Sequence, residues 1–423
     1  MNNTPKELLK FVSENDVKFI RLTFCDVFGN LKNIAVMPNE LEQAFVNGIP
    51  FDAADFGVNS SDLLLFPDIS TLSVMPWRPK SGRVVRFFCS LKYPDGKDFT
   101  DDMRTNLIDY INELRLNGYS CEMGTRCEFY LFNLDEKGEP TLIPHDNGGY
   151  LDVAPLDKCE NVRREICLSL EEMGLNPKSS CHKHGPAQNE IDFRANEPVN
   201  AADDMVHYKT VVKSISAQCG LFASFMPKPL ENHHGSALNI SLSIRKNGEH
   251  IFGTSPEKIT ENGRCFISGI MRRIGEITAF LNPTVNSYKR FGVGNAPQYV
   301  NCSEKNCAPL IRIPHSAGIT PRIELRSADA ACNPYIAFRL ILSAGMEGIK
   351  SRDNMISDYD KSIQLPDSLE KAVQISRESD FVRRCLPESV IGRMMNYAEY
   401  QIENYKNSTD KSEFEQKFYF PYI

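Results

Sequence analysis

The chain has 423 residues, of which 41% are hydrophobic and 24% charged, a composition typical of folded globular proteins. Forty-eight lysines and arginines against 55 aspartates and glutamates leave a net charge of −7, which gives no overall attraction to nucleic acid or to an anionic membrane. No apolar run approaches the ~20 residues that span a bilayer, and the N-terminus lacks the apolar stretch of a secretory signal. We therefore expect a cytoplasmic protein whose 13 cysteines are reduced thiols.

The N-terminal part of the chain is predicted to form short strands and turns. Residues 18–25 place apolar side chains on one face, the Gly-Asn pair at 29–30 supplies a turn, and residues 32–36 complete a hairpin. A further strand is expected at residues 83–88. A polar link at residues 94–98 follows, and we place a domain boundary there.

The predicted domains therefore cover residues 1–98 and residues 99–423. In the second domain, strands are expected at residues 128–132 and 238–244. Helices are expected to begin at Asp101 and end at Gly118, and to cover 162–173, 201–218, 334–349 and 389–405. The strands and helices follow no regular βαβ period, which favours an α+β fold.

Several common catalytic motifs are absent from the sequence. There is no phosphate-binding loop of the GxxxxGK[ST] or GxGxxG type and no GxSxG nucleophile motif. Cysteine and histidine gather at two places, which could hold zinc: Cys181, His182 and His184, with His233 and His234. The favoured interpretation is that these side chains pack or form hydrogen bonds in turns, because structural zinc sites usually pair two well-spaced ligand couples.

Polar residues are concentrated beside apolar strands in the segments 128–130, 188–192 and 322–326. Strand alternation places Arg322, Glu324 and Arg326 on one face. Such a row of guanidinium groups could bind an anionic substrate, because guanidinium binds carboxylate or phosphate through two hydrogen bonds. A solvated sheet face with ion pairs is the alternative, and the pattern by itself leaves both open.

Several segments together resemble the signatures of type I glutamine synthetases. The main ones are Asn282-Pro-Thr-Val-Asn-Ser-Tyr-Lys-Arg290, Ala308-Pro-Leu-Ile-Arg-Ile-Pro314 and Arg322-Ile-Glu-Leu-Arg326. Shorter matches keep the order and spacing of the family: Phe51-Asp52, Gly148-Gly-Tyr150, Met226-Pro-Lys-Pro229 and Phe420-Pro-Tyr-Ile423. The resemblance covers nearly the whole chain. It implies an N-terminal β-grasp domain, a larger catalytic domain and a homo-oligomer, a dodecamer of two hexamers with active sites between subunits.

The resemblance also implies a reaction. Family members use ATP to phosphorylate the side-chain carboxylate of glutamate, and ammonia then displaces the phosphate, with divalent metals neutralising phosphoryl charge. The family holds Mg²⁺ or Mn²⁺ with glutamates and one histidine, and Glu128, Glu190 and Glu324 match three of these glutamates. Arg126 and Lys183 stand where two further glutamates belong, and Asn239 replaces the histidine.

The substitutions at Arg126 and Lys183 keep the net charge that the family's metal site has when its ions are bound. Three glutamates with Arg126 and Lys183 leave the same net charge, minus one, as the family's glutamates with a pair of divalent ions. A lysine about 4 Å from a divalent ion opposes its entry by roughly 8 kcal/mol at an effective dielectric constant near 20. Binding of Mg²⁺ or Mn²⁺ is therefore expected to be weak or absent. The alternative is that Arg126 and Lys183 turn outward and metals still bind.

Other functional positions of the family are partly kept. The flexible-loop glutamate that takes a proton from ammonium aligns with Asn295, and an arginine that meets the phosphoryl group aligns with Cys307. An amide cannot act as that base. The resemblance assigns the ammonium site to Asp52, with Tyr150 also retained in the catalytic set. It assigns substrate binding to Gly235, Arg290 and Arg326, and nucleotide binding to Ser243, Arg312 and Arg322.

We therefore hypothesise a glutamine-synthetase-like protein with a retained pocket for an amino acid and for ATP, in which metal-dependent glutamine synthesis is weak or lost. Two alternatives keep the family scaffold: a ligase with an altered substrate or mechanism, and a regulatory pseudoenzyme that either senses an amino acid or nucleotide or co-assembles with an active synthetase. A third has different chemistry, with Cys307 as nucleophile or with Cys181, His182 and His184 as a metal site.

Overall fold

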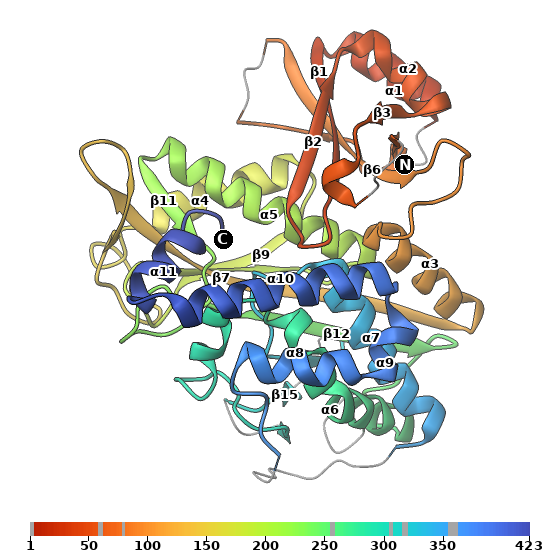
Figure 1. Ribbon diagram of the computed structural model, residues 1–423. Helices are drawn as coiled ribbons and strands as arrows, with labels where there is room; N and C mark the ends of the chain where they lie inside the picture. The colour runs from red at the N-terminus through yellow and green to blue at the C-terminus, as the bar shows by residue number, and fades with distance from the viewer. Residues whose placement is uncertain are drawn as a thin grey trace.

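The computed structural model describes residues 4–57, 62–77, 81–253, 259–303, 308–314, 320–353 and 363–423. It has the expected α+β architecture, with a small N-terminal unit packed on one end of a larger unit (Figure 1). Two separate sheets form the centres of these units. The C-terminal helices, drawn in blue, cross the face of the larger unit.

The N-terminal unit contains a six-stranded sheet with the order β2-β1-β6-β4-β3, in which β5 also pairs with β6. Its strands are β1 (Val17–Cys25), β2 (Leu31–Val36), β3 (Ile49–Phe51), β4 (Leu63–Pro67), β5 (Ser73–Val74) and β6 (Arg83–Lys92). Its helices are α1 (Pro5–Glu14) and α2 (Leu41–Asn47). The alternation in β1 buries Ile20, Leu22 and Phe24, and these side chains belong to the core of this unit.

The predicted hairpin at the start of the chain is present, and its tip contacts the larger unit. Cys25 pairs with Leu31, and Gly29 adopts a φ of +82° in the turn. A Cβ at Gly29 would lie 2.9 Å from the Cα of Asn333, so glycine permits this close approach. The side chain of Asn333 donates hydrogen bonds to the carbonyl oxygens of Asp26 and Val27, each at 3.2 Å. The hairpin is thereby fixed to the residue that caps the N-terminus of α7 (Pro334–Ser351).

A buried ion pair also joins the two units. Arg104, in α3 (Met103–Leu116), donates from Nε to Asp203 in α5 (Pro198–Gln218) at 2.9 Å. Its Nη2 donates to Asp68 of the N-terminal unit, also at 2.9 Å. Because each charge is paired and hydrogen-bonded, the network can be buried without an uncompensated charge.

The larger unit is centred on a ten-stranded sheet with the order β14-β15-β16-β12-β7-β10-β9, in which β8 and β11 also pair with β7 and β13 pairs with β12. Its strands are β7 (Tyr119–Leu134), β8 (Pro140–Pro144), β9 (Pro177–His182), β10 (Gln188–Phe193), β11 (Leu221–Ser224), β12 (Leu238–Lys246), β13 (Glu249–His250), β14 (Cys302–Ser303), β15 (Ile311–Arg312) and β16 (Ile323–Leu325). The long strand β7 lies at the centre and pairs with both β10 and β12.

Helices pack around this sheet (Figure 1). Besides α3, α5 and α7 they are α4 (Glu160–Glu172), α6 (Glu261–Leu281), α8 (Leu369–Glu378), α9 (Asp380–Cys385), α10 (Glu388–Asn407) and α11 (Lys411–Phe418). The predicted helices are present, although Asp102 rather than Asp101 caps α3. Helices α1 and α2 lie in the part of the chain predicted to form only strands and turns, and α6, α8, α9 and α11 were not predicted either. Helix α6 contains glycines, which have low helix propensity. Packing explains one of them: a Cβ at Gly269 would fall on the carbonyl oxygen of Ala344 in α7.

Two further expectations concern the surface and the thiols. Within the described ranges, no helix is both long enough and apolar enough to cross a membrane. Every cysteine in those ranges is a free thiol, most of them buried. Cys307 lies outside the described residues.

Candidate functional site

A cavity of about 330 Å³ lies beside strands β7 and β12, and we call it the central cavity. Ten of the residues selected from the sequence line it: Arg126, Glu128, Tyr150, Lys183, Gly235, Asn239, Arg290, Asn295, Arg312 and Arg326. These residues come from separate segments that the large sheet and its loops bring together. The grouping of polar side chains that the sequence indicated is therefore present in three dimensions.

Strand register explains why the charged positions meet. Glu190 on β10 lies directly opposite Glu128 on β7. Arg126, two residues earlier on β7, lies opposite Asn239 on β12. Directly opposed side chains in an antiparallel pair are about 5 Å apart, so like charges at such positions repel. The pair Glu128 and Glu190 therefore needs a cation nearby.

Lys183 supplies that cation. It follows β9 directly, and its Nζ lies 3.3 Å from Oε1 of Glu128 and 3.2 Å from Oε2 of Glu190. Burial lowers the pKa of Lys183, but the two carboxylates outweigh burial and leave the pKa above its ordinary value. Burial, together with the charge of Glu128, raises the pKa of Glu190 to about 7. Lys183 therefore points inward, between the two glutamates.

Arg126 occupies the next position along β7 that faces the same way. Its Nη2 donates to Oε1 of Glu324 at 2.8 Å, and its Nε lies 3.6 Å from both Glu190 and Asp192. Burial opposes its charge, yet Glu324 and Glu190 leave the pKa of Arg126 above its ordinary value. The sequence analysis did not name Asp192 as a site residue. Its position two residues after Glu190 on the same strand could have indicated it, because side chains two apart on a strand point to the same face.

Three stacked rings form one wall of the central cavity. The ring of His184 stacks on Tyr150 with centroids 4.4 Å apart, and on His234 with centroids 4.7 Å apart. Burial, with the neighbouring charges of His234 and Lys183, lowers the pKa of His184. Burial and Lys228 likewise lower the pKa of His234. Both imidazoles therefore favour the neutral form, and sequence reasoning missed this wall because the stack joins three separate loops.

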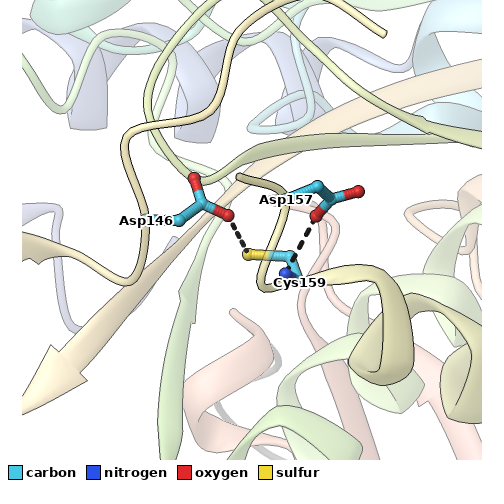
Figure 2. Close-up of side chains that lie close together, drawn as sticks. All are labelled: Asp146, Asp157 and Cys159. Atoms are coloured by element: carbon cyan, nitrogen blue, oxygen red, sulfur yellow. Dashed lines mark hydrogen bonds between the residues drawn. The ribbon is translucent and has the colours of Figure 1, made fainter. Parts of the chain in front are cut away.

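A buried acidic group positions two of these loops (Figure 2). Asp146 accepts hydrogen bonds from Sγ of Cys159 at 3.2 Å and from the backbone amides of Gly148, Ala187 and Lys158. It also contacts Nε2 of His182 at 3.0 Å. Asp157 accepts from the amide of Cys159 at 2.9 Å. Carboxylates and a thiol in one place suggest a metal site, but their partners here are the protein's own hydrogen-bond donors.

The zinc hypothesis for Cys181, His182 and His184 is not supported by this geometry. His182 has no exposed side-chain surface, its Nδ1 contacts the carbonyl oxygen of Lys183 at 2.8 Å, and its Nε2 contacts Asp146. With both ring nitrogens engaged, His182 has no lone pair to give to a metal. His184 is part of the ring stack instead. The histidines pack and form hydrogen bonds, which was the favoured interpretation.

Arg290 lies at the cavity wall with only 1% of its surface exposed. Its Nη2 donates to the carbonyl oxygens of Ser327 and Ala328, each at 2.9 Å, while Nε and Nη1 have no hydrogen-bond partner among the residues that the structure describes. Burial lowers its pKa. Gly235 makes room for this side chain, because a Cβ there would collide with Cγ of Arg290 and lie 2.6 Å from the carbonyl oxygen of Pro227.

A second cavity of about 380 Å³ adjoins the central one, and we call it the second cavity. It is lined by Ser243 and Arg322, two of the positions selected for nucleotide binding, and by Glu324. Arg126 lines both cavities, so its guanidinium group lies at their boundary. Arg312, the third nucleotide-binding candidate, lines the central cavity instead.

The remaining candidates lie elsewhere. Asp52 is on the N-terminal unit, exposed, where its Oδ1 accepts from the amide of Ala54 at 2.9 Å, and it lines neither cavity. Asn295 lines the central cavity together with its neighbours Val293 and Ala296. Cys307 lies outside the described residues.

Two protein-family models match this chain, one over each of its two units. Residues 16–94 match the model of the glutamine synthetase β-grasp domain, and residues 100–417 match that of the glutamine synthetase catalytic domain. The two matches together cover nearly the whole chain. They also identify the small N-terminal unit as the β-grasp domain that the sequence predicted.

Individual glutamine synthetases are also similar to this chain over nearly its full length. The chain is 40% identical to a glutamine synthetase of Methanosarcina mazei, with 95% of each chain covered, and 37% identical to one of Staphylococcus aureus, with 98% of each covered. Its fold is similar to GmaS in complex with ADP, with a TM-score of 0.86 at 25% identity over 97% of this chain and 98% of that one. It is also similar to Plasmodium falciparum glutamine synthetase, with a TM-score of 0.86 at 20% identity and 99% of each chain covered. The chain belongs to the glutamine synthetase family.

Proposed function

We propose that this chain binds a small carboxylate or amino-acid ligand in the central cavity and a nucleotide such as ATP in the second cavity, and that metal-dependent glutamine synthesis is weak or lost. One observation carries the proposal. The amine of Lys183 lies within 3.3 Å of both Glu128 and Glu190, and the guanidinium of Arg126 lies 2.8 Å from Glu324. Fixed cations thus stand between the three glutamates that match the family's metal ligands.

These residues do not fit a divalent centre. Mg²⁺ and Mn²⁺ take oxygen ligands, preferentially carboxylates that carry unbalanced negative charge. Here Lys183 and Arg126 already balance the charge of Glu128, Glu190 and Glu324. At an effective dielectric constant near 20, each fixed cation about 4 Å away would oppose a divalent ion by roughly 8 kcal/mol before relaxation. Asn239 and Asn295 further replace a ligand and a base with neutral amides, which take up no proton at neutral pH.

The proposal of nucleotide binding rests on the residues that line the second cavity. Arg322 and Ser243 offer a guanidinium and a hydroxyl, groups that bind phosphate oxygens. The similar structure of GmaS is a complex with ADP, which supports a nucleotide site in this fold. Family resemblance further supports a cytoplasmic homo-oligomer, a dodecamer of two hexamers. In such an assembly the exposed Asp52 would belong to a site completed between subunits.

A ligase with an altered mechanism is the second candidate function. The observation that favours it is the position of Arg126, which lines both cavities and so stands where groups bound in the two cavities would meet. A fixed cation there would stabilise negative charge on a transferred group. Glutamate- or amine-dependent consumption of ATP in the presence of EDTA would support this candidate against a non-catalytic binding protein.

Calorimetric titration with Mn²⁺ tests the main proposal. We expect the wild-type chain to bind no stoichiometric Mn²⁺ at submillimolar concentration and to form glutamine far below normal family rates. The variant Arg126→Glu/Lys183→Glu/Asn239→His should gain Mn²⁺ affinity by at least about a hundredfold. The matched control Lys137→Glu/Arg164→Glu reverses two exposed charges elsewhere and should gain none. Tight Mn²⁺ binding by the wild type, or glutamine formation at normal family rates, would refute the proposal.

A further inference from the structure

Both ring nitrogens of His182 face oxygen atoms that accept hydrogen bonds. Its Nδ1 lies 2.8 Å from the carbonyl oxygen of Lys183, and its Nε2 lies 3.0 Å from Oδ1 of Asp146. A carbonyl oxygen carries no proton, and neither does an ionised carboxylate. A neutral imidazole has a single N–H group, so it would leave one of these two contacts without a hydrogen. Both nitrogens donate at once in the imidazolium form alone.

The contacts of Asp146 require an ionised carboxylate. Its Oδ1 also accepts from the backbone amides of Gly148 at 3.1 Å and Ala187 at 2.7 Å, and its Oδ2 accepts from Sγ of Cys159 at 3.2 Å. Burial raises the pKa of Asp146, but these hydrogen bonds and the one from His182 leave it well below its ordinary value. Burial lowers the pKa of His182, yet its contact with Asp146 leaves it above the ordinary value. Because neither side chain has exposed surface, the two form a buried ion pair.

This ion pair is joined to the main chain of Lys183, just beyond the end of strand β9. The pairing of β9 with β10 extends as far as His182, which lies opposite Asn189. The amide of Lys183 donates to the carbonyl oxygen of Gln188 at 2.7 Å, and the side chain of His182 supplies the donor for the carbonyl oxygen of Lys183. Both backbone polar groups of Lys183 are therefore held in place.

A fixed backbone at Lys183 determines where its long and flexible side chain can reach. Nζ lies within 3.3 Å of both Glu128 and Glu190, and the side chain is 13% exposed. Holding a lysine side chain in one geometry costs rotamer entropy, and a backbone that is already ordered lowers the total cost of that contact. Asp146 also holds Ala187, three residues before Glu190, so one carboxylate fixes the chain on both sides of the contact.

We infer that His182 is a buried imidazolium, paired with Asp146, that positions the amine of Lys183 between Glu128 and Glu190. The inference rests on the proposed function, since it explains how the fixed cation of that proposal is kept in its place. Within the described ranges, His182 is not among the residues that line the central cavity, so it acts on the cavity through Lys183. It is a positioning residue, and Asp146 is the acceptor that holds it.

Reductive methylation of lysine amines in the full chain, in EDTA and followed by peptide mass spectrometry, tests the positioning role. In the wild type, the amine of Lys183 should react at least about tenfold more slowly than that of the exposed Lys137, because its carboxylate partners keep it protonated. His182→Phe keeps a ring but removes both donors, and it should raise the rate at Lys183 at least about tenfold. Lys209, whose Nζ donates to the carbonyl oxygen of Ala330 at 3.1 Å, should react as in the wild type.

Two further measurements keep the inference testable if His182→Phe does not fold. Asp146→Asn keeps an oxygen acceptor for His182 but removes its charge, so it should raise the rate at Lys183 by less than His182→Phe does. Neutron diffraction from wild-type crystals exchanged into D₂O tests the charge of His182 directly. At a pD of about 8, where an unperturbed histidine is neutral, the map should show deuterium on both Nδ1 and Nε2.

Three results would overturn the inference. Deuterium on one ring nitrogen alone would show that His182 is neutral. An unchanged rate at Lys183 in the folded variants His182→Phe and Asp146→Asn would show that neither residue positions the amine. An equal rise at Lys209 would show a general loosening of the fold in place of a positioning role. Because these measurements contain no metal or ligand, the inference can fail while the Mn²⁺ titration upholds the proposed function, and the reverse can also occur.

Discussion

The Nζ atom of Lys183 lies 3.3 Å from Oε1 of Glu128 and 3.2 Å from Oε2 of the facing Glu190. Two carboxylates that strand register places opposite each other are held together by one amine. Removing one partner of a buried ion pair leaves an uncompensated charge and is far more costly than losing an exposed pair. This relationship predicts how the site responds to substitution.

Replacing Lys183 by alanine should lower the free energy of unfolding by about 2–4 kcal/mol in EDTA, because Glu128 and Glu190 then repel each other. Added Mn²⁺ should restore part of that loss, since the vacated position faces two carboxylates. Chemical denaturation with and without Mn²⁺ measures both effects. Lys137→Ala, an exposed control, should change stability by less than ~0.5 kcal/mol. No difference between the two variants would contradict the account.

Substitution of Gly235 by alanine should displace Arg290 and weaken anion binding, because a Cβ there collides with the arginine side chain. The associated loss of stability should be about 1–3 kcal/mol, as for other overpacked sites. Gly275→Ala is the matched control, since it lies in helix α6 with nothing within 4 Å of its Cβ position. That control should be neutral or stabilising by up to ~1 kcal/mol. Titration of both variants with L-glutamate, and chemical denaturation of both, provide the comparison.

The group formed by Asp146, Asp157 and Cys159 should behave as a hydrogen-bonded support of the cavity loops (Figure 2). Asp146→Asn should lower the free energy of unfolding by about 3–5 kcal/mol, because it removes the charged acceptor of His182. Added Zn²⁺ should not raise the melting temperature of the wild-type chain. Stoichiometric Zn²⁺ binding that Asp146→Asn or Cys159→Ala abolishes would identify a metal centre instead.

Acid should destabilise the fold through His207. Burial lowers its pKa, and Arg86 and Arg104 lower it further, so the folded chain holds a neutral imidazole packed 4.5 Å from the ring of Phe88. The unfolded chain binds a proton below a pH of about 6.5. Above pH ~6.5, His207 therefore does not reduce the free energy of unfolding. As the pH falls below ~6.5, the free energy of unfolding decreases by up to ~1.4 kcal/mol per pH unit.

Denaturation curves between pH 5 and pH 8 check this dependence. In His207→Gln, the free energy of unfolding should fall less steeply with decreasing pH below ~6.5, the pKa of histidine in the unfolded chain. This difference in slope is expected whether or not the substitution changes stability at neutral pH. His233→Gln, at an exposed position, should keep the wild-type slope. An unchanged slope in His207→Gln would mean that other groups cause the acid sensitivity.

Much of the fold was predictable, because alternation and capping act locally. The hairpin of β1 and β2, the strand β12 and the helices α4, α5, α7 and α10 all follow apolar periodicity. Helix α6 was missed, since Gly269 suits close packing against α7 rather than helix propensity. Such a packing requirement depends on a distant segment and leaves no local signal.

The candidate site was predictable only in part. Family motifs located the glutamates and their substituted neighbours, and the charge balance suggested that Arg126 and Lys183 face inward. The ring stack of Tyr150, His184 and His234 and the acceptor role of Asp146 were not anticipated. They arise where separate loops meet, and that meeting depends on the whole fold.

A crystal structure of the chain grown with Mn²⁺ and ATP, with anomalous scattering measured at the manganese edge, tests the central claim most directly. The account predicts no anomalous peak among Glu128, Glu190 and Glu324, and nitrogen atoms of Lys183 and Arg126 in contact with their carboxylates. Manganese coordinated by these glutamates, with Arg126 and Lys183 rotated away, would contradict it.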